Sequence, residues 1–249
     1  MPAPGRESQS ASFAAVPGGG FAFLLAAGRA GAAAIHCCPH GTGPNGDAVR
    51  AALAEARIPA ALPPDPRGDT GHCVVLITPD GERTMVSWPG VESRVAAEAL
   101  RDARAGDVVV LSGYALREAA ELGAFLAAVP AGAVLVFDPA PIVATLPREA
   151  IAAVLARADW VSGNRAEIEA LPARTGGTIL RDGAAGAWLF ERGCAPVHVG
   201  APAVIARDTT GAGDVHVATF AAKLALGAAP RDALEAANRA AAAHVAGAP

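Results

Sequence analysis

The sequence predicts an α/β protein, a three-layer αβα sandwich with a mostly parallel central sheet and a small β lid. Strand-like and helix-like segments alternate, as in a sheet covered on both faces. Hydrophobic residues make up 52% of the 249 residues, enough for one sizeable core. We therefore expect a single domain over residues 1–249. Lid segments are expected near residues 6–20 and 70–90, because Ser8 to Val16 and His72 to Ser87 alternate in polarity and Asp80-Gly81 is a hairpin turn signal.

The elements follow in order along the chain. The predicted strands are 33–38, 73–78, 108–112, 134–138, 160–162, 177–181 and 187–191. The predicted helices are 21–30, 46–56, 94–103, 116–128, 148–156, 165–171, 215–226 and 231–246. Gly227 is a suitable stop for the helix before it, and Pro230 suits a first turn because its missing N–H costs nothing there.

Composition excludes several classes of protein. The net charge is -4 with a pI near 5.9, and aromatics are only 4%, so neither a basic stripe nor a stacking platform for nucleic acid is expected. The apolar stretch 21–38 is broken by Gly28, Arg29 and Gly31, so it predicts neither a membrane span nor a signal sequence.

Four cysteines without a C-x-x-C motif favour a reducing cytoplasm. The run His36-Cys37-Cys38-Pro39-His40 holds four potential zinc ligands. A second cluster at zinc-site spacing is missing, so a buried strand end is the preferred interpretation.

The most informative stretch is Asp208-Thr209-Thr210-Gly211-Ala212-Gly213-Asp214, which places a carboxylate where helix 215–226 is predicted to begin. A helix start built from Gly-Ala-Gly presents backbone N–H groups without side chains in the way, and the helix dipole adds positive charge. Such a place attracts phosphate, and a carboxylate beside it can take a proton from a hydroxyl group. The implied chemistry is phosphoryl transfer to an alcohol.

This stretch resembles the signature of the ribokinase-like (PfkB) carbohydrate kinases. The resemblance implies that Asp214 is the catalytic base and that Gly211, Ala212 and Gly213 line the anion hole. Asn164-Arg165-Ala166-Glu167 resembles the family's N-x-x-E motif, which implies that Asn164 and Glu167 act on magnesium, through water, and on the phosphates of ATP. Asn164 and Glu167 also fit a helix capping box, and both interpretations can hold together.

Further matches occur in family order. Asp69-Thr70-Gly71 and Asp80-Gly81-Glu82-Arg83-Thr84 resemble the lid strands and their turn. The remaining implied site residues are Gly18, Gly19, Gly20 and Gly43 for the substrate, and Arg181, Gly183, Gly186, Thr209 and Asn238 for the nucleotide, with Arg181 neutralising phosphate charge and Asn238 near adenine.

The chain also departs from the family pattern. Family members usually begin with a strand ending in a substrate-binding Asp, whereas Met1 here precedes what resembles the lid. Ala22 stands where an Asn is usual, Gly43 where an acid is usual, and Asp138-Pro139 lacks the Asn and Arg that often follow. Each lost polar group weakens recognition of substrate hydroxyls by about 1–3 kcal/mol.

A competing motif lies at residues 41–46, where Gly-Thr-Gly-Pro-Asn-Gly satisfies the dinucleotide-binding G-x-G-x-x-G. Asp65 follows about 20 residues later, but between Pro64 and Pro66, where a strand end is not expected. A dehydrogenase is therefore disfavoured. The G-x-x-x-x-G-K-[ST] motif of P-loop kinases is absent.

The resemblance thus implies an ATP- and magnesium-dependent kinase that phosphorylates a hydroxymethyl group of a sugar or sugar-like substrate. A nucleoside kinase, or a nucleotide-binding pseudoenzyme that has lost part of the acceptor site, stays open as an alternative. The lid also suggests a homodimer, since it is an interface in several family members.

Overall fold

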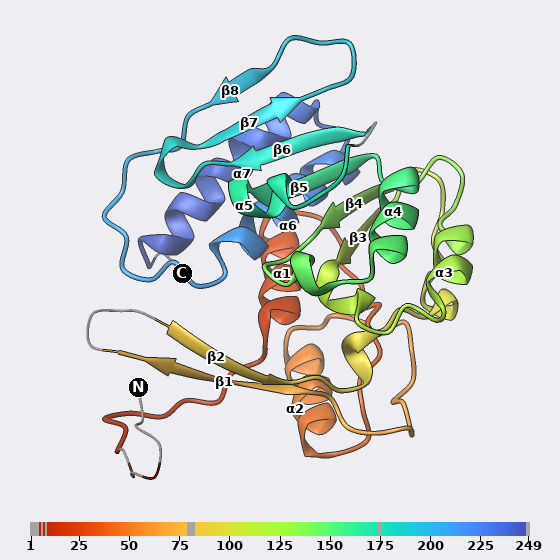
Figure 1. Cartoon of the computed structure of the whole chain (residues 1–249), viewed down its shortest axis with the longest axis vertical. Helices are drawn as coiled ribbons and strands as arrows, with labels where there is room; N and C mark the ends of the chain where they lie inside the picture. Colours follow the sequence, from red (N-terminus) through yellow and green to blue (C-terminus); the bar gives the residue numbers. More distant parts are fainter. Residues whose placement is uncertain (1–4, 6, 8, 79–82, 174–175, 248–249) are drawn as a thin grey trace.

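A computed structural model describes residues 5, 7, 9–78, 83–173 and 176–247. Its centre is a six-stranded sheet with the order β3-β4-β5-β6-β7-β8, and a separate two-stranded sheet pairs β1 with β2 (Figure 1). Strands β3 to β6 run parallel, whereas β7 and β8 are antiparallel additions. This architecture confirms the predicted fold class, a mostly parallel α/β sheet with helices and a small antiparallel sheet.

The lid strands are β1 (His72–Ile77) and β2 (Arg83–Trp88). The central strands are β3 (Val108–Ser112), β4 (Val134–Asp138), β5 (Trp160–Asn164), β6 (Gly177–Arg181), β7 (Ala187–Phe190) and β8 (Val197–Val199). The α-helices are α1 (Gly19–Arg29), α2 (Pro44–Glu55), α3 (Leu122–Ala128), α4 (Arg148–Arg157), α5 (Arg165–Glu169), α6 (Ala212–Ala225) and α7 (Pro230–Val245). Short 3-10 helices are Val91–Ser93, Ala97–Leu100, Gly113–Leu116, Val143–Thr145 and Gly183–Ala185.

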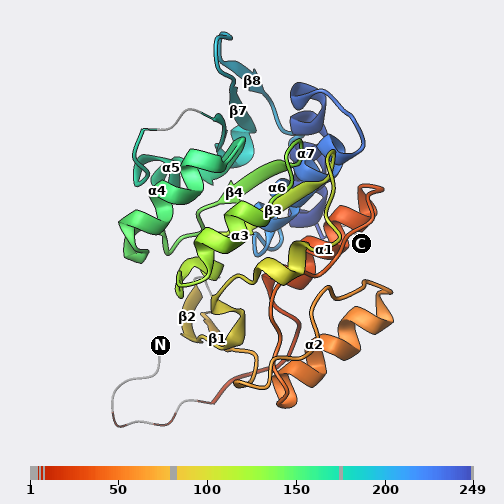
Figure 2. The same cartoon turned by 90° about the vertical axis from the view of Figure 1, so that its right-hand side faces the viewer.

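The helices form two layers around the sheet. Figure 2 shows α3, α4 and α5 on one side and α1, α6 and α7 on the other. Strand β4 explains this arrangement, because Leu135 and Phe137 pack into the cluster on the α3 and α4 side while Val136 packs on Val217 of α6. A parallel strand between two helix layers is apolar on both faces, and these side chains are almost fully buried.

The outer strands are covered more fully on one face. Ile179 and Leu189 pack against Phe220 and other residues of the α6 and α7 layer. On the opposite face the crossover from β5 to β6 supplies only α5, which has five residues. Phe190 on that face is 38% exposed.

Two predicted strands are wrong. Segment 33–38 contributes one isolated bridge, from His36 to Ala60, because Pro59 and Pro63 have no backbone N–H with which the partner segment could extend it. Residues 9–16 of the predicted first lid segment are exposed and form no strand, since no neighbouring strand pairs with them in the described part of the chain; Ser8 lies outside it.

Two predicted helices are shorter than expected. Segment 94–103 forms only the 3-10 turn Ala97–Leu100, and segment 116–128 becomes helical at Leu122. Both changes have one cause, since Arg94 and Glu118 form a parallel bridge in which the Glu118 N–H donates to the carbonyl of Ser93 at 3.0 Å. The three-residue strand β8 was not predicted from the sequence. The predicted Asp80-Gly81 turn lies outside the described residues.

Candidate active site

Three parallel strands end in polar residues at one edge of the central sheet. Asp138, Asn164 and Arg181 are the last residues of β4, β5 and β6, and Asn164 pairs directly with Arg181 in the strand register. The carboxyl ends of parallel strands are the usual place for ligands in open α/β sheets. This edge of the sheet is therefore the candidate site.

Arg181 is the centre of the polar network. Its guanidinium lies 2.9 Å from a carboxylate oxygen of Asp138 and 2.8 Å from one of Glu167, and it donates to the carbonyl of Gly213 at 3.3 Å. Burial acts to lower the pKa of Arg181, but the charges of Asp138 and Glu167 outweigh burial and raise it. Arg181 was predicted to neutralise nucleotide phosphates; the structure places its charge between two carboxylates, where it ties β4, α5 and α6 together.

Asn164 and Glu167 form the capping box at the start of α5. The Asn164 side-chain oxygen accepts from the Glu167 N–H at 2.9 Å, and the Glu167 carboxylate accepts from the Asn164 N–H at 2.8 Å. Among the described residues, no three His, Cys, Asp or Glu side chains converge as metal ligands. A cation held by Asn164 and Glu167 would therefore need bridging water.

The Gly-Ala-Gly turn begins α6 as the sequence indicates. Gly211 is the N-cap with φ of 75°, a left-handed conformation that glycine adopts without a steric penalty. The Asp208 carboxylate accepts from the Thr210 N–H at 2.8 Å and from its hydroxyl at 2.6 Å, which shapes the preceding loop. The N-cap is a glycine, so it has no side chain that could bond to the first N–H groups of α6.

Asp214 lies in the first turn of α6 and is packed against the start of α1. A Cβ added at Gly19 would lie 2.9 Å from the Asp214 Oδ2, whereas one added at Gly18 or Gly20 would meet nothing within 4 Å. Burial raises the pKa of Asp214, and Asp138 and Glu167 raise it further against the opposing effect of Arg181 and His244. The carboxylate is therefore a better proton acceptor than an exposed aspartate.

Gly43 occupies a different environment. It is the N-cap of α2, and a Cβ added there would lie 2.5 Å from the Asp69 carboxylate. The Asp69 carboxylate accepts from the N–H groups of Asn45 at 3.0 Å and Gly46 at 2.8 Å. Desolvation acts to raise the pKa of Asp69, but these backbone hydrogen bonds lower it overall. Gly43 is thus held by Asp69, and the structure does not show it in contact with Asp214.

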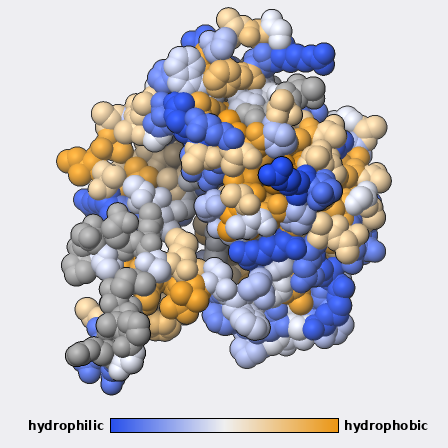
Figure 3. Space-filling model, viewed as in Figure 1, coloured by the Kyte–Doolittle hydropathy of each residue, from blue (hydrophilic) through white to orange (hydrophobic). Residues whose placement is uncertain are grey.

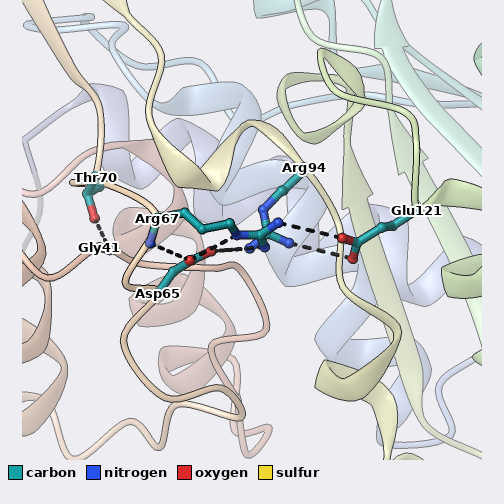
Figure 4. A network of polar contacts seen from close by, with 6 residues as sticks. All are labelled: Gly41, Asp65, Arg67, Thr70, Arg94 and Glu121. Atoms are coloured by element: carbon teal, nitrogen blue, oxygen red, sulfur yellow. Dashed lines mark hydrogen bonds and ion pairs between the residues drawn. The ribbon is translucent and has the colours of Figure 1, made fainter.

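The same contacts remove the dinucleotide-binding alternative. The helix start that would take a pyrophosphate is filled by the Asp69 carboxylate. Asp65, which stands where a dinucleotide-binding protein would have its ribose-binding acid, is 8% exposed and forms ion pairs with Arg67 and Arg94. Arg94 forms a further ion pair with Glu121 (Figure 4). Neither acidic side chain is available to a dinucleotide.

The residues predicted to bind the nucleotide come from several elements of the fold. Gly183 and Gly186 form the turn between β6 and β7, both with positive φ. Thr209 lies in the exposed loop before α6, where its carbonyl accepts from the Ala212 N–H at 3.3 Å.

Asn238, by contrast, is 3% exposed. Its amide donates to the carbonyl of Val199 at 2.8 Å, and its oxygen pairs with the imidazole of His216 at 3.0 Å. The Asn238 side chain holds the end of β8, and its polar atoms bond to protein groups. Burial and the charge of Arg181 lower the pKa of His216 to about 4, so the ring beside Asn238 is neutral.

Sequence reasoning missed three residues near Asp214. Asp138 ends β4, and its strand-end position before Pro139 was a usable signal. Tyr114 follows β3 at 41% exposure, and besides burial the charge of Asp214 raises its pKa. His244, in the last turn of α7, pairs with the carbonyl of Thr210 at 2.6 Å. The last two carried no local sequence signal.

The run from His36 to His40, for which a buried strand end was the preferred interpretation, contains no disulfide. Cys37 and Cys38 are free thiols, and the rings of His36 and His40 lie 5.8 Å apart. Burial, with the neighbouring His40, lowers the pKa of His36 to about 4, so the His36 ring is neutral.

The family model described as pfkB family carbohydrate kinase matches residues 4–247. An uncharacterised sugar kinase of Escherichia coli, YegV, is 30% identical over 241 residues, covering 83% of this chain and 70% of the relative.

Two solved structures show the same fold. Aminoimidazole riboside kinase of Salmonella enterica, with its riboside and an ATP analogue, aligns with a TM-score of 0.79 at 21% identity over 96% of this chain and 89% of that one. Fructokinase of Vibrio cholerae, solved with fructose, ADP and calcium, aligns with a TM-score of 0.76 at 21% identity, over 92% of this chain and 84% of that one. Within the described residues, no helix is both long and apolar enough to cross a membrane.

Proposed function

The chain belongs to the pfkB family of carbohydrate kinases, and we propose that it transfers the γ-phosphoryl group of ATP to a hydroxymethyl group of a sugar or sugar-like acceptor. The observation that carries this proposal is the position of Asp214. Its carboxylate lies in the first turn of α6, directly after the left-handed Gly211, and packs against Gly19 of α1. A proton acceptor and an anion-binding helix start therefore share one place.

Asp214 is the general base of the proposed reaction. It would accept the proton of the acceptor hydroxyl as that oxygen attacks phosphorus, a role that typically contributes about 10²–10⁴ to the rate. The backbone N–H groups of Gly211, Ala212 and Gly213, with the dipole of α6, would stabilise the negative charge on the phosphoryl oxygens. Arg181 would hold this turn in place through the carbonyl of Gly213.

The carboxylates around Arg181 suit a hydrated magnesium ion. Asp138 and Glu167 both raise the pKa of Asp214, so negative charge exceeds the positive charge of Arg181 at this edge of the sheet. Magnesium prefers oxygen ligands and keeps several of its waters, which agrees with carboxylates that already bond to protein groups. Magnesium bound with ATP would supply charge neutralisation at the phosphates.

Asp214→Asn tests the proposal. The variant cannot accept a proton, so acceptor-dependent ADP release should fall by about 10²–10⁴. Because the raised pKa means that ionised Asp214 destabilises the folded state at neutral pH, the melting temperature should stay equal or rise. The exposed Asp102→Asn is the matched control and should keep full activity. A loss of less than about tenfold in Asp214→Asn would exclude the general-base role.

ADP release measured with a panel of hexoses, pentoses, sugar acids and nucleosides would identify the acceptor. A nucleoside is the second candidate, since the Salmonella relative in fold was solved with a riboside. If the melting temperature rises with magnesium-ATP but no acceptor releases ADP, the chain is a nucleotide-binding pseudoenzyme. If neither effect occurs, the kinase proposal fails.

The lid supports a homodimer as part of the same proposal. Val74 pairs with Val86 on one face of the two-stranded sheet, at 50% and 62% exposure, and Val75 pairs with Met85 on the other, at 41% and 54%. Figure 3 shows apolar side chains exposed over this region. An isolated two-stranded sheet is only marginally stable in water. One of its apolar faces can cover the site, while the other packs against a second copy of the chain. Val86→Lys should shift light-scattering mass from dimer to monomer; an unchanged mass would exclude this interface.

A further inference from the structure

His244 joins the end of α7 to the loop that precedes the catalytic helix. Its Nε2 lies 2.6 Å from the carbonyl oxygen of Thr210, and because that oxygen can only accept, the imidazole donates through Nε2–H. His244 and Thr210 are 34 residues apart in the sequence. The contact is therefore a tertiary tether between the last turn of α7 and the signature loop.

A second tether runs beside the first. The N–H groups of Arg207 and Asp208 both donate to the carbonyl of Val245, at 2.7 and 3.3 Å. The end of α7 thus fixes the loop at both of its ends, at 207–208 and at Thr210. The residue that follows is Gly211, the left-handed N-cap of α6.

The imidazole also borders the turn itself. A Cβ added at Gly211 would lie 3.4 Å from the His244 Nε2 and 3.9 Å from the Asp214 Oδ2. The side of the Gly211 turn that a Cβ would occupy therefore borders both His244 and the base. His244 acts to lower the pKa of Asp214, against the larger effect of burial, which raises it.

We propose that His244 is a positioning residue for phosphoryl transfer. By holding the Thr210 carbonyl, His244 keeps that oxygen turned toward α7 and fixes Gly211 in its left-handed conformation. The N–H groups of Gly211 to Gly213 then face the site without a competing carbonyl. This inference rests on the proposed kinase activity, but the tether can also be measured without turnover.

The test compares His244→Leu with His244→Gln. Leucine fills space but cannot donate, so kcat should fall about tenfold, equivalent to about 1.4 kcal/mol, while KM for the acceptor stays within about twofold. The glutamine amide reaches as far as Nε2 and can donate, so His244→Gln should recover most of the loss. Arg239→Gln, on the exposed surface of the same helix, is the control and should leave both constants unchanged.

Hydrogen exchange supplies a readout that needs no activity. In His244→Leu, the amides of residues 207–214 should exchange about fivefold faster or more, while those of α4 stay unchanged and His244→Gln resembles the wild type. Equal kcat and equal exchange in the Leu and Gln variants would overturn the proposal. If the wild type releases no ADP with any acceptor, the kinase function fails, and the exchange result alone decides whether His244 holds the loop.

Discussion

Gly19→Ala is the most direct test of how α1 and α6 meet at the site. The added methyl would lie 2.9 Å from the Asp214 Oδ2, below any separation that a real Cβ shows. Ordinary contact begins at 3.4 Å, so the carboxylate or the start of α1 must move by about 0.5 Å. A misplacement of about 1 Å can cost about 10²-fold in rate, and half of that displacement corresponds to about tenfold.

A second glycine of the same helix supplies the control for this experiment. Gly28 lies near the end of α1, and a Cβ there meets nothing within 4 Å. Both substitutions replace glycine with the best helix former, so neither should lower stability through helix propensity. Steady-state ADP release should give a kcat about tenfold lower for Gly19→Ala and unchanged for Gly28→Ala. Equal kcat in the two variants would refute the packing of Gly19 on the base.

Two further predictions concern charge. In a pH–rate profile, the acid limb of kcat/KM should lie above pH 3.8, the ordinary pKa of an aspartate. Burial and Asp138 raise the pKa of Asp214, and activity is lost as the pH falls through that raised value. An acid limb at or below pH 3.8 would contradict this prediction. Arg181→Met should lower the free energy of unfolding by about 3–5 kcal/mol, because it removes the cation between Glu167 and Asp138, whose side chains are only 7% and 14% exposed. The exposed ion pair of Arg239 should contribute about 1 kcal/mol or less, measured with Arg239→Met. Urea unfolding measures both, and similar losses would show that the Arg181 network does not stabilise the fold.

The parallel half of the fold was predictable from local pattern. Segments 108–112, 134–138 and 177–181 are strands with the expected bounds. Segment 134–138 is the clearest case, because a strand buried on both faces is a continuous apolar run. Segment 33–38 has a similar composition and is not a strand, because its neighbours are prolines that cannot extend the pairing. Composition indicates that a segment can be buried, but its pairing partners decide whether it becomes a strand.

The sequence by itself indicated the backbone geometry of the α6 start, since Gly211, Ala212 and Gly213 are contiguous and the left-handed conformation of Gly211 is local. It likewise indicated the capping box, whose partners lie three residues apart.

Only the tertiary structure decided what surrounds that start. Arg181 meets Asp138 from 43 residues away, and His244 meets Thr210 from 34. Gly19 reaches Asp214 from the opposite end of the chain. Contacts of this kind depend on which strand ends and helix termini the packed sheet brings together, and short-range periodicity carries no record of them.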